Sequence, residues 1–312
     1  MVRPDVSFVI TVYNKENDLP AMIHSIMRQL ENITYEFIFV DDASTDNSIA
    51  VIEKELEESN NFTILKNKDN YGPSIRLNQG CAAASGTHLF LMDGDDILAK
   101  GALKIMLGYL RKNKADFVFG SSKVVARAQR SLLDIELPDS TLAQISTTPL
   151  DSVLTGRYVR MSYLVTKKLY LESGQKYGVA NERIFIQDES LPITLAYRAK
   201  KMVTLSAPAV YSAKSESSLS VNKFQQIHDR FYAYYYALLE FKDLSNRQKN
   251  LIYKRAISSV WKAKKISSHL IDRLFIITYL TSRLFPSTLK SAKNLEQYRK
   301  FIDGLQNVRK IH

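Results

Sequence analysis

The first 120 residues alternate short apolar, β-branched runs with segments whose apolar residues recur at helical spacing. The apolar runs cover residues 5–12, 35–40, 62–66, 87–92 and 116–119. Between them the spacing predicts helices over about 19–30, 49–58, 73–84 and 98–112. This β-α-β-α order predicts an α/β fold with a doubly wound, mostly parallel sheet. Ligands of such sheets collect at the carboxyl ends of the strands.

The rest of the chain is less regular at first and then helical. Residues 120–221 contain an apolar segment, an acidic turn and a helix in RIFIQDESLPITLAYRAKK, followed by a strand at 202–205. From Phe224 onward, apolar residues spaced by three and four predict three amphipathic helices, of which Pro286 ends the third. We therefore expect a sheet-containing domain followed by a helical extension.

Composition excludes several classes of protein. The chain has 312 residues, 45% of them hydrophobic and 24% charged, which are values for an ordinary folded protein. Cys81 is the single cysteine, so neither an internal disulfide nor a cysteine-based zinc site can form, and a reducing compartment is expected. The N-terminal residues do not resemble a signal peptide, and the longest later apolar stretch, LFIITYLTSRL, is too short to span a bilayer. No transmembrane helix is predicted.

The acidic segment Asp93-Gly94-Asp95-Asp96 directly follows an apolar strand. Like charges this close together destabilise a fold unless a cation neutralises them. Carboxylate oxygens suit Mg²⁺ or Mn²⁺, and Mg²⁺ takes one or two carboxylates together with water and substrate phosphates. The alternative is an acidic turn in which Asp96 caps the following helix.

Other polar residues at strand ends carry weaker signals. Asp41 and Asp42 could recognise a ring N–H or a ribose hydroxyl, or could cap a helix and face solvent. Tyr13 could stack on a nucleobase or pack against the protein. Gly72-Pro73-Ser74 with Arg76 could open a phosphate-binding helix or form an ordinary turn. Asp188 could act as a general base, or belong to a helix cap together with Glu189.

The order and spacing of these segments resemble the family-2 glycosyltransferases of the GT-A fold. The resemblance covers roughly residues 5–221 and rests on SFVITVYNKENDLPAMIHSIMRQ, YEFIFVDDASTDNS, NYGPSIRLNQGCAAASGTHLFLMDGDD and IQDESLPITLAYRAK. It implies a Rossmann-like GT-A domain over 1–221. Residues 1–120 would form its nucleotide-sugar-binding half, 121–221 its acceptor-binding half, and 222–312 a basic helical extension.

The resemblance also implies roles for individual residues. DGDD resembles the DxD motif, with Asp95 as ligand of Mn²⁺ or Mg²⁺ and Asp93 facing the ribose. Asp188 aligns with the catalytic base of inverting members. The other nucleotide-sugar-binding positions are Tyr13 beside the base, Thr11 next to it, Asp42 at the uracil and Arg76 on the nucleotide side of the cleft.

Some positions depart from the family pattern. Gln187 stands where the family often has Glu, and Tyr211-Ser212-Ala213-Lys214 lacks the histidine of Tyr-Arg-x-His. The Gln-x-x-Arg-Trp motif of processive members is absent. Transfer of one sugar per encounter is therefore expected.

The expected activity is inverting, metal-dependent transfer of one sugar from a nucleotide-sugar, with a UDP-sugar as the expected donor. The acceptor would be a hydroxyl of a glycan, a lipopolysaccharide or a lipid-linked saccharide. Two alternatives stay open: a nucleotidyltransferase acting on sugar phosphates, and a non-catalytic nucleotide-sugar-binding protein. Tyr-Asn-Lys-Glu after the first strand does not match the Gly-rich loop of nucleotidyltransferases.

Positive charge is concentrated in the last third of the chain. Residues 222–312 contain 18 Lys and Arg against 6 Asp and Glu, whereas residues 1–221 contain 25 against 26. Such helices can cap the domain, dock on an anionic membrane or bind nucleic acid. Nucleic-acid binding is not expected, because its usual motifs are missing. We hypothesise a cytoplasmic protein that contacts the inner face of the membrane peripherally.

Overall fold

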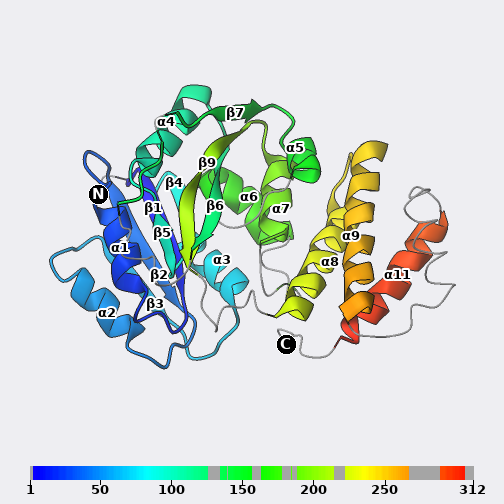
Figure 1. Cartoon of the computed structure of the whole chain (residues 1–312), viewed down its shortest axis with the longest axis horizontal. Coiled ribbons are helices and arrows are strands. Elements are labelled where there is room, and N and C mark those ends of the chain that lie inside the picture. The colour runs from blue at the N-terminus through cyan, green and yellow to red at the C-terminus, as the bar shows by residue number, and fades with distance from the viewer. Residues whose placement is uncertain are drawn as a thin grey trace.

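The computed structural model describes residues 3–125, 134–138, 140–156, 163–177, 184, 188–213, 222–266 and 289–305. Within these residues a nine-stranded sheet lies between two helical layers, and a group of further helices extends from one side (Figure 1). The third helical stripe predicted from the sequence, which ends at Pro286, lies outside the described residues.

The sheet has a parallel half and a mixed half. Its order is β3-β2-β1-β4-β8-β6-β9-β5, with β7 paired to β9. The pairs from β3 to β4 are parallel, whereas β8 runs antiparallel to both β4 and β6. The strands are β1 Val6–Val12, β2 Tyr35–Asp41, β3 Phe62–Lys66, β4 His88–Asp93, β5 Asp96–Leu98, β6 Phe117–Val125, β7 Ala143–Ser146, β8 Tyr163–Thr166 and β9 Met202–Ala213.

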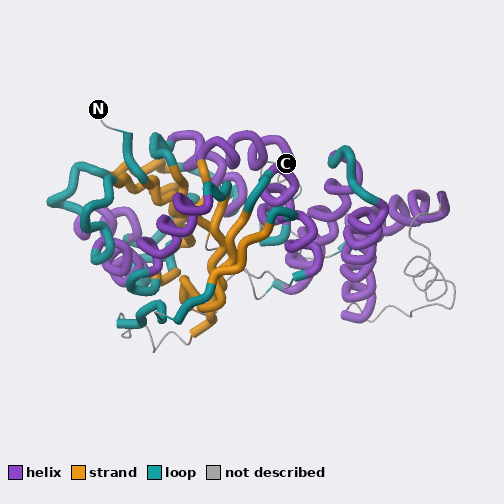
Figure 2. The backbone as a smooth tube through the Cα atoms, turned by 90° about the horizontal axis from the view of Figure 1, so that it is seen from above, coloured by secondary structure: helices purple, strands orange, loops and turns teal. Residues whose placement is uncertain are grey.

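Helices cover both faces of the sheet, as a doubly wound fold requires. In the parallel half α1, α2 and α4 lie on one face, and α3, α6 and α7 lie on the other, as the purple helices around the orange strands also show (Figure 2). The helices are α1 Leu19–Met27, α2 Ser48–Glu55, α3 Pro73–Ala83, α4 Ala102–Asn113, α5 Pro149–Thr155, α6 Lys167–Tyr177, α7 Ser190–Arg198, α8 Lys223–Glu240, α9 Asn246–Ile266 and α11 Leu289–Asp303.

Alternation along each strand builds two separate hydrophobic cores. On β1, Val9 faces the core under α3, whereas Phe8 and Ile10 face the core under α1 and α4. The same alternation on β2 and β4 explains why these strands read as continuous apolar runs in the sequence. The predicted α/β class and the doubly wound arrangement are thereby confirmed.

Two local predictions are wrong. The helix expected from about Leu98 begins at Ala102, because residues 96–98 form strand β5, which pairs with β9. Asp96 therefore lies in a strand and caps no helix. The acidic residues of the DGDD segment thus belong to the sheet edge, not to a helix start.

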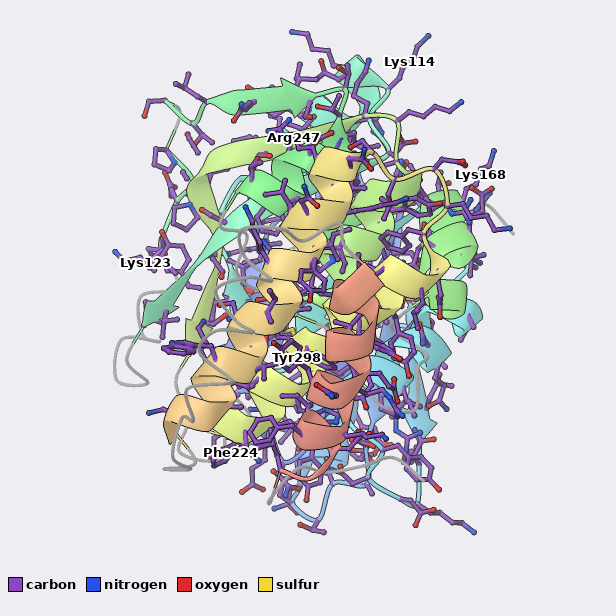
Figure 3. The ribbon with its side chains drawn as sticks, turned by 90° about the vertical axis from the view of Figure 1, so that its right-hand side faces the viewer. Lys114, Lys123, Lys168, Phe224, Arg247 and Tyr298 are labelled. Atoms are coloured by element: carbon purple, nitrogen blue, oxygen red, sulfur yellow. The ribbon has the colours of Figure 1, made fainter. Side chains whose placement is uncertain are left out.

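The C-terminal helices pack against the sheet-containing part of the chain. Apolar side chains of α8, α9 and α11 belong to the same core cluster as those of β1, β4 and α7. Figure 3 shows this side of the molecule, with Arg247 near the start of α9, Phe224 at the start of α8 and Tyr298 on α11. The stripe predicted from Phe224 to Phe241 is thus a core-facing surface along most of its length. Among the described residues, no helix has the length and apolar character needed to cross a bilayer.

Candidate active site

Asp93 ends β4 beside Thr11 of β1, at the carboxyl end of the parallel strands. The Thr11 hydroxyl donates a hydrogen bond of 2.8 Å to Asp93 Oδ1. Burial, together with the nearby charge of Asp95, raises the pKa of Asp93 to about 6. Asp93 therefore lies in a buried environment that carries additional negative charge.

Asp95 lies two residues further, in the turn between β4 and β5. The Lys15 ammonium group, from the loop after β1, pairs with Asp95 Oδ2, and both side chains are largely buried. The Asp95 carboxylate thus already has a cationic partner, the ammonium group of Lys15. Within the described residues no group of three or more His, Cys, Asp or Glu side chains is arranged to hold a metal ion. The donor set fits Mg²⁺ or Mn²⁺ bound by one carboxylate and completed by phosphate oxygens.

Asp96 is the third carboxylate of this segment and points into the protein. It pairs with Ser212 across the antiparallel β5–β9 ladder and is 3% exposed. Burial and the charges of Asp93 and Asp95 raise its pKa well above the ordinary value, although a hydrogen bond with Ser212 opposes the shift. Burial thus favours the protonated, neutral form of Asp96 beneath Asp93 and Asp95.

Asp42 and Arg76 form a buried ion pair next to the end of β2. Arg76 Nε donates to Asp42 Oδ1 at 2.7 Å, and both side chains are 6% exposed. The backbone N–H groups of Tyr71 and Gly72 also donate to the Asp42 carboxylate, each at 2.8 Å. Gly72 adopts φ +85°, which favours glycine and lets the chain turn into α3. Asp42 therefore fixes the start of α3, and its Oδ2 can still accept a further hydrogen bond.

Two tyrosines lie exposed around this ion pair. Tyr13, after β1, is 43% exposed, and Tyr71, before α3, is 42% exposed. The Arg76 guanidinium lies over the Tyr71 ring, 5.3 Å from its centroid. Such rings offer flat faces for stacking a base.

The loop that carries Tyr13 and Lys15 is held to the loop after β2. Asn14 adopts φ +52°, its N–H donates to Ser44 Oγ, and its side-chain oxygen accepts from the Thr45 N–H at 2.8 Å. Lys15 N–H donates to Ser48 Oγ at 2.7 Å. The two loops therefore form one rigid wall beside Asp42.

Asp188 lies next to Tyr163, the first residue of β8. Tyr163 is fully buried, pairs with Leu91 of β4, and has its ring 5.1 Å from that of Phe119. Burial and the charges of Asp188 and Glu189 raise the pKa of Tyr163 well above its ordinary value. Leu91 is two residues before Asp93, roughly 7 Å along a strand. The structure thus places Asp188 within electrostatic range of Tyr163, whose strand β8 pairs with β4, the strand that ends at Asp93.

Glu189, the next residue, is held by the C-terminal helices. Its carboxylate accepts a hydrogen bond of 2.7 Å from the Tyr234 hydroxyl and pairs with Arg230 at 2.5 Å. Arg255 of α9 donates to the same Tyr234 hydroxyl at 2.9 Å. Glu189 occupies the N-cap position of α7, as the helix-cap alternative expected, but its side chain makes no capping hydrogen bond.

Sequence reasoning missed several residues at this site. In the sequence, Lys15 serves only as a mismatch to a Gly-rich loop. Its position after β1, two residues from Tyr13, is a signal that could have identified it as a site residue. Tyr163 and the partners of Glu189 have no recognisable sequence pattern, because they are far from the acidic turn in the sequence and approach it only in the folded chain. Gln187 and Lys214, at which the family pattern departs, lie outside the described residues.

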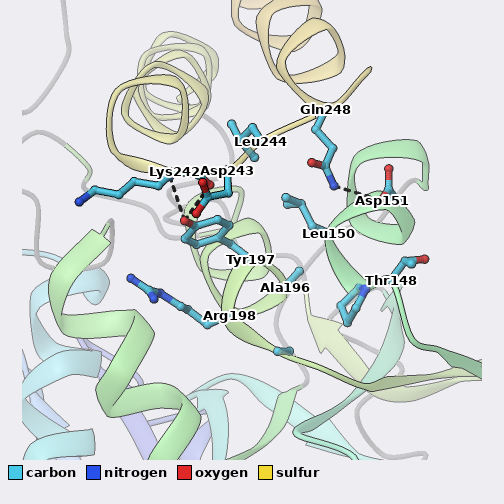
Figure 4. Close-up of a pocket in the computed structure, with 12 residues that line it drawn as sticks. Thr148, Leu150, Asp151, Ala196, Tyr197, Arg198, Lys242, Asp243, Leu244 and Gln248 are labelled. Carbon is cyan, nitrogen blue, oxygen red and sulfur yellow. Dashed lines mark hydrogen bonds between the residues drawn. The ribbon is translucent and has the colours of Figure 1, made fainter. Parts of the chain in front are cut away.

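A cavity of about 420 Å³ opens at the opposite end of α7 from Asp188. Its wall includes Tyr197, whose hydroxyl donates to the Lys242 carbonyl at 3.0 Å, and Asp151, which accepts from Gln248 Nε2 at 3.1 Å (Figure 4). The nine residues of α7 separate this cavity from Asp188 by roughly 13 Å. The cavity is therefore separate from the acidic edge of the sheet.

Known proteins resemble this chain most clearly over the half that carries the acidic edge. Residues 7–137 match the family model described as glycosyl transferase family 2. The resemblance to the family-2 glycosyltransferases noted in the sequence is thereby confirmed over these residues.

Curated glycosyltransferases match less than half of the chain. Glycosyltransferase GlyG of Streptococcus pneumoniae is 29% identical over 117 residues, which are 37% of this chain and 38% of that protein. The poly(ribitol-phosphate) β-glucosyltransferase of Bacillus spizizenii is 29% identical over 120 residues, 38% of this chain and 19% of that protein. Each match thus spans less than half of the relative's length.

Solved structures extend the likeness to almost the whole chain. Staphylococcus aureus TarS 1–349 in complex with UDP-GlcNAc superposes with a TM-score of 0.68 and 16% identity, covering 96% of this chain and 90% of that one. The mannosyltransferase PcManGT of Pyrobaculum calidifontis, in complex with GDP-Man and Mn²⁺, gives a TM-score of 0.54 and 14% identity, covering 97% and 87%. At these identities the likeness shows the fold, and it confirms the predicted GT-A architecture.

Proposed function

We propose that this protein is an inverting glycosyltransferase that moves one sugar from a UDP-sugar to a hydroxyl group of an acceptor. The observation that carries the proposal is the acidic end of β4, formed by Asp93 and Asp95. Asp188 supports it, because its charge acts on Tyr163, the partner of Leu91 in β4. The match of residues 7–137 to glycosyl transferase family 2 supports glycosyl transfer over the two alternatives, sugar-phosphate nucleotidyl transfer and non-catalytic binding.

Donor binding is assigned to the loops after β1, β2 and β4. Tyr13 stacks on the base, Asp42 accepts a ring N–H through Oδ2, and Arg76 holds Asp42 in place from below. Thr11 fixes Asp93, which accepts a hydrogen bond from the ribose. Asp95 holds the divalent metal, which when bound neutralises charge on the diphosphate.

Asp188 takes the proton of the acceptor hydroxyl as general base. Holding the acceptor and the donor in one geometry removes much of the entropic barrier to their reaction. The proton moves from the hydroxyl to a carboxylate oxygen of Asp188 as the new C–O bond forms. Attack from the face opposite the leaving group inverts the configuration at the anomeric carbon.

The acceptor is proposed to be a saccharide, a polyol phosphate or a lipid-linked saccharide. Two relatives, from Bacillus spizizenii and Staphylococcus aureus, are named for glycosyl transfer to poly(ribitol-phosphate). Reaction at the inner face of the membrane, with the basic C-terminal helices against anionic lipid, stays a prediction that flotation with anionic liposomes tests.

Variants of the two central carboxylates test the proposal. Release of UDP from UDP-sugars is measured with Mn²⁺, together with transfer to poly(ribitol phosphate). Asp95→Ala should lower both rates at least a hundredfold. Asp188→Asn should lower transfer to a similar extent while the donor still raises the melting temperature. The exposed Glu53→Gln serves as a matched control and should keep full activity. UDP release that needs neither Asp95 nor metal would contradict the mechanism.

A further inference from the structure

The acid next to the proposed base is surrounded by cationic side chains from the C-terminal helices. Arg230 Nη2 of α8 lies 2.5 Å from Glu189 Oε1. Arg255 of α9 reaches the same carboxylate through the Tyr234 hydroxyl, which donates to Glu189 Oε2. The charges of α8 and α9 are thus concentrated beside the turn that carries Asp188.

Arg255 is fully used inside the protein. Its Nη2 donates to the carbonyl oxygens of Leu154 and Gly156 at 2.9 and 2.8 Å, and its guanidinium lies 5.7 Å from the Tyr234 ring centroid. Arg255 therefore connects α9 to α5 and has little capacity left for a ligand.

Lys262 is the cation of this group that faces solvent. Because only five residues connect α8 to α9, the two helices run antiparallel, and the Tyr234–Arg255 contact fixes their register. Lys262, two turns beyond Arg255, then lies level with the first half of α8, near Arg230. Partial burial and the charge of Arg230 lower the pKa of Lys262, and the charge of Glu189 opposes that shift.

Among the described residues that these contacts connect, positive charges outnumber negative ones. Asp188 and Glu189 supply two negative charges, whereas Arg230, Arg255 and Lys262 supply three positive ones. Keeping Lys262 close to Arg230 costs free energy that an anionic ligand would recover. The Lys262 amine is exposed, so a ligand can reach it from solvent.

We propose that Lys262, together with Arg230, forms a subsite for a phosphate ester of the acceptor beside Asp188. The proposal rests on the proposed function, because it assigns the acceptor of that same site. Lysine binds phosphate as a point charge, and arginine adds directed N–H donors. In a polyol phosphate chain only a few bonds separate the reacting hydroxyl from the next phosphate, which suits a subsite that includes Arg230, the ion-pair partner of the residue next to the proposed base. Relatives named for poly(ribitol-phosphate) use an acceptor of this chemistry.

A binding experiment tests the subsite without any turnover. Trp261 is the single tryptophan of the chain and precedes Lys262, so its fluorescence reports on this position of α9. Titration with oligo(ribitol phosphate) should give a saturable change that weakens at high salt. Lys262→Gln should weaken binding about tenfold or more. Lys254→Gln removes another exposed charge, about two turns earlier on α9, and should bind like the unaltered protein.

Several outcomes would overturn the subsite. These are no fluorescence change, equal binding by both lysine variants, or equal binding of an uncharged ribitol oligomer. Flotation with vesicles containing phosphatidylglycerol separates the sources of phosphate. Lys262-dependent binding to vesicles, but not to the soluble oligomer, would assign the site to a lipid headgroup and contradict an acceptor subsite.

Kinetics separate this inference from the proposed function. Lys262→Gln should raise the KM for the phosphate-bearing acceptor about tenfold and change the KM for the UDP-sugar less than twofold. Lys254→Gln should change neither value. If no form of the protein turns over any UDP-sugar while Trp261 still reports Lys262-dependent binding, the proposed function fails and the phosphate subsite stands.

Discussion

At the residue scale, one carboxylate of β2 joins three segments of the parallel sheet. Glu36 Oε1 accepts hydrogen bonds from Ser7 Oγ at 2.6 Å, from the Ser85 N–H at 2.5 Å and from the Gly86 N–H at 3.1 Å. Burial would raise the pKa of Glu36, but these hydrogen bonds outweigh it and hold the pKa below its ordinary value. Glu36 therefore fixes the loop that leads into β4.

Glu36→Gln should lower the free energy of unfolding by about 1–2 kcal/mol at pH 7, because the charged acceptor is lost. A carboxyl group with a lowered folded-state pKa stabilises the fold above its unfolded-state pKa, and this contribution is lost as pH falls through the folded value. Urea denaturation at pH 7 and at successively lower pH should show the gap between the two proteins closing below about pH 4.3. A gap of constant size would contradict the role given to the charge.

At the scale of elements, α3 packs directly against the two central strands that carry Thr11 and Asp42. A Cβ atom on Gly80 would lie 2.5 Å from Val9 Cγ1 and 2.7 Å from Val40 Cγ2. Glycine is thus required here for close approach of the helix and the sheet. The start of α3 also holds the Asp42 carboxylate. The packing of α3 at Gly80 therefore fixes the distance between this carboxylate and the sheet.

Gly80→Ala should destabilise the protein by about 1–3 kcal/mol through overpacking. Gly108 provides a matched control, because it lies in α4 with nothing within 4 Å of its added Cβ. Gly108→Ala should stabilise the protein by about 0.5–1 kcal/mol, as expected for a helix interior. Thermal unfolding measures both changes, and an equal effect of the two substitutions would show that packing on β1 and β2 plays no part.

At the scale of the whole molecule, the C-terminal helices complete a core that begins in the sheet. Phe231, Ile257 and Ile302 are fully buried and belong to the same cluster as Val9 and Leu91. The sequence predicts a division at residue 221, where the composition changes. In the structure, the residues on the two sides of this division share one apolar core.

A chain that ends at residue 221 should lack a cooperative unfolding transition, because α5, α6 and α7 would lose the apolar partners that α8 and α9 provide. Circular dichroism during heating, with the full chain as control, measures this. A truncated protein that unfolds cooperatively near the melting temperature of the full chain would show that residues 1–221 fold on their own.

Sequence reasoning succeeded where local patterns dominate. The runs at Val6–Val12, Tyr35–Asp41 and His88–Asp93 are buried on both faces, so composition alone marks them as strands. The polar residues that end them follow directly, which is why Asp42, Asp93 and Asp95 could be predicted to gather at one edge.

Reasoning from sequence failed where position depends on distant pairing. Strand β8 enters antiparallel between β4 and β6, and Asp188 acts electrostatically on Tyr163, the first residue of that strand. Strand β5 has three residues, too few for a periodic pattern, so the sequence predicts a helix from its last residue onward. The ammonium group of Lys15 beside Asp95 likewise reflects the folding of two loops.

The contact between Glu189 and the C-terminal helices limits how such a chain can be recombined. Tails exchanged between two members of the family would bring new residues to the positions of Arg230 and Tyr234. Unless Glu189 and the residues that meet it change together, the grafted tail leaves an unpaired acid directly beside Asp188. Functional chimeras of these enzymes therefore need a junction that keeps the α7 turn and α8 from one parent.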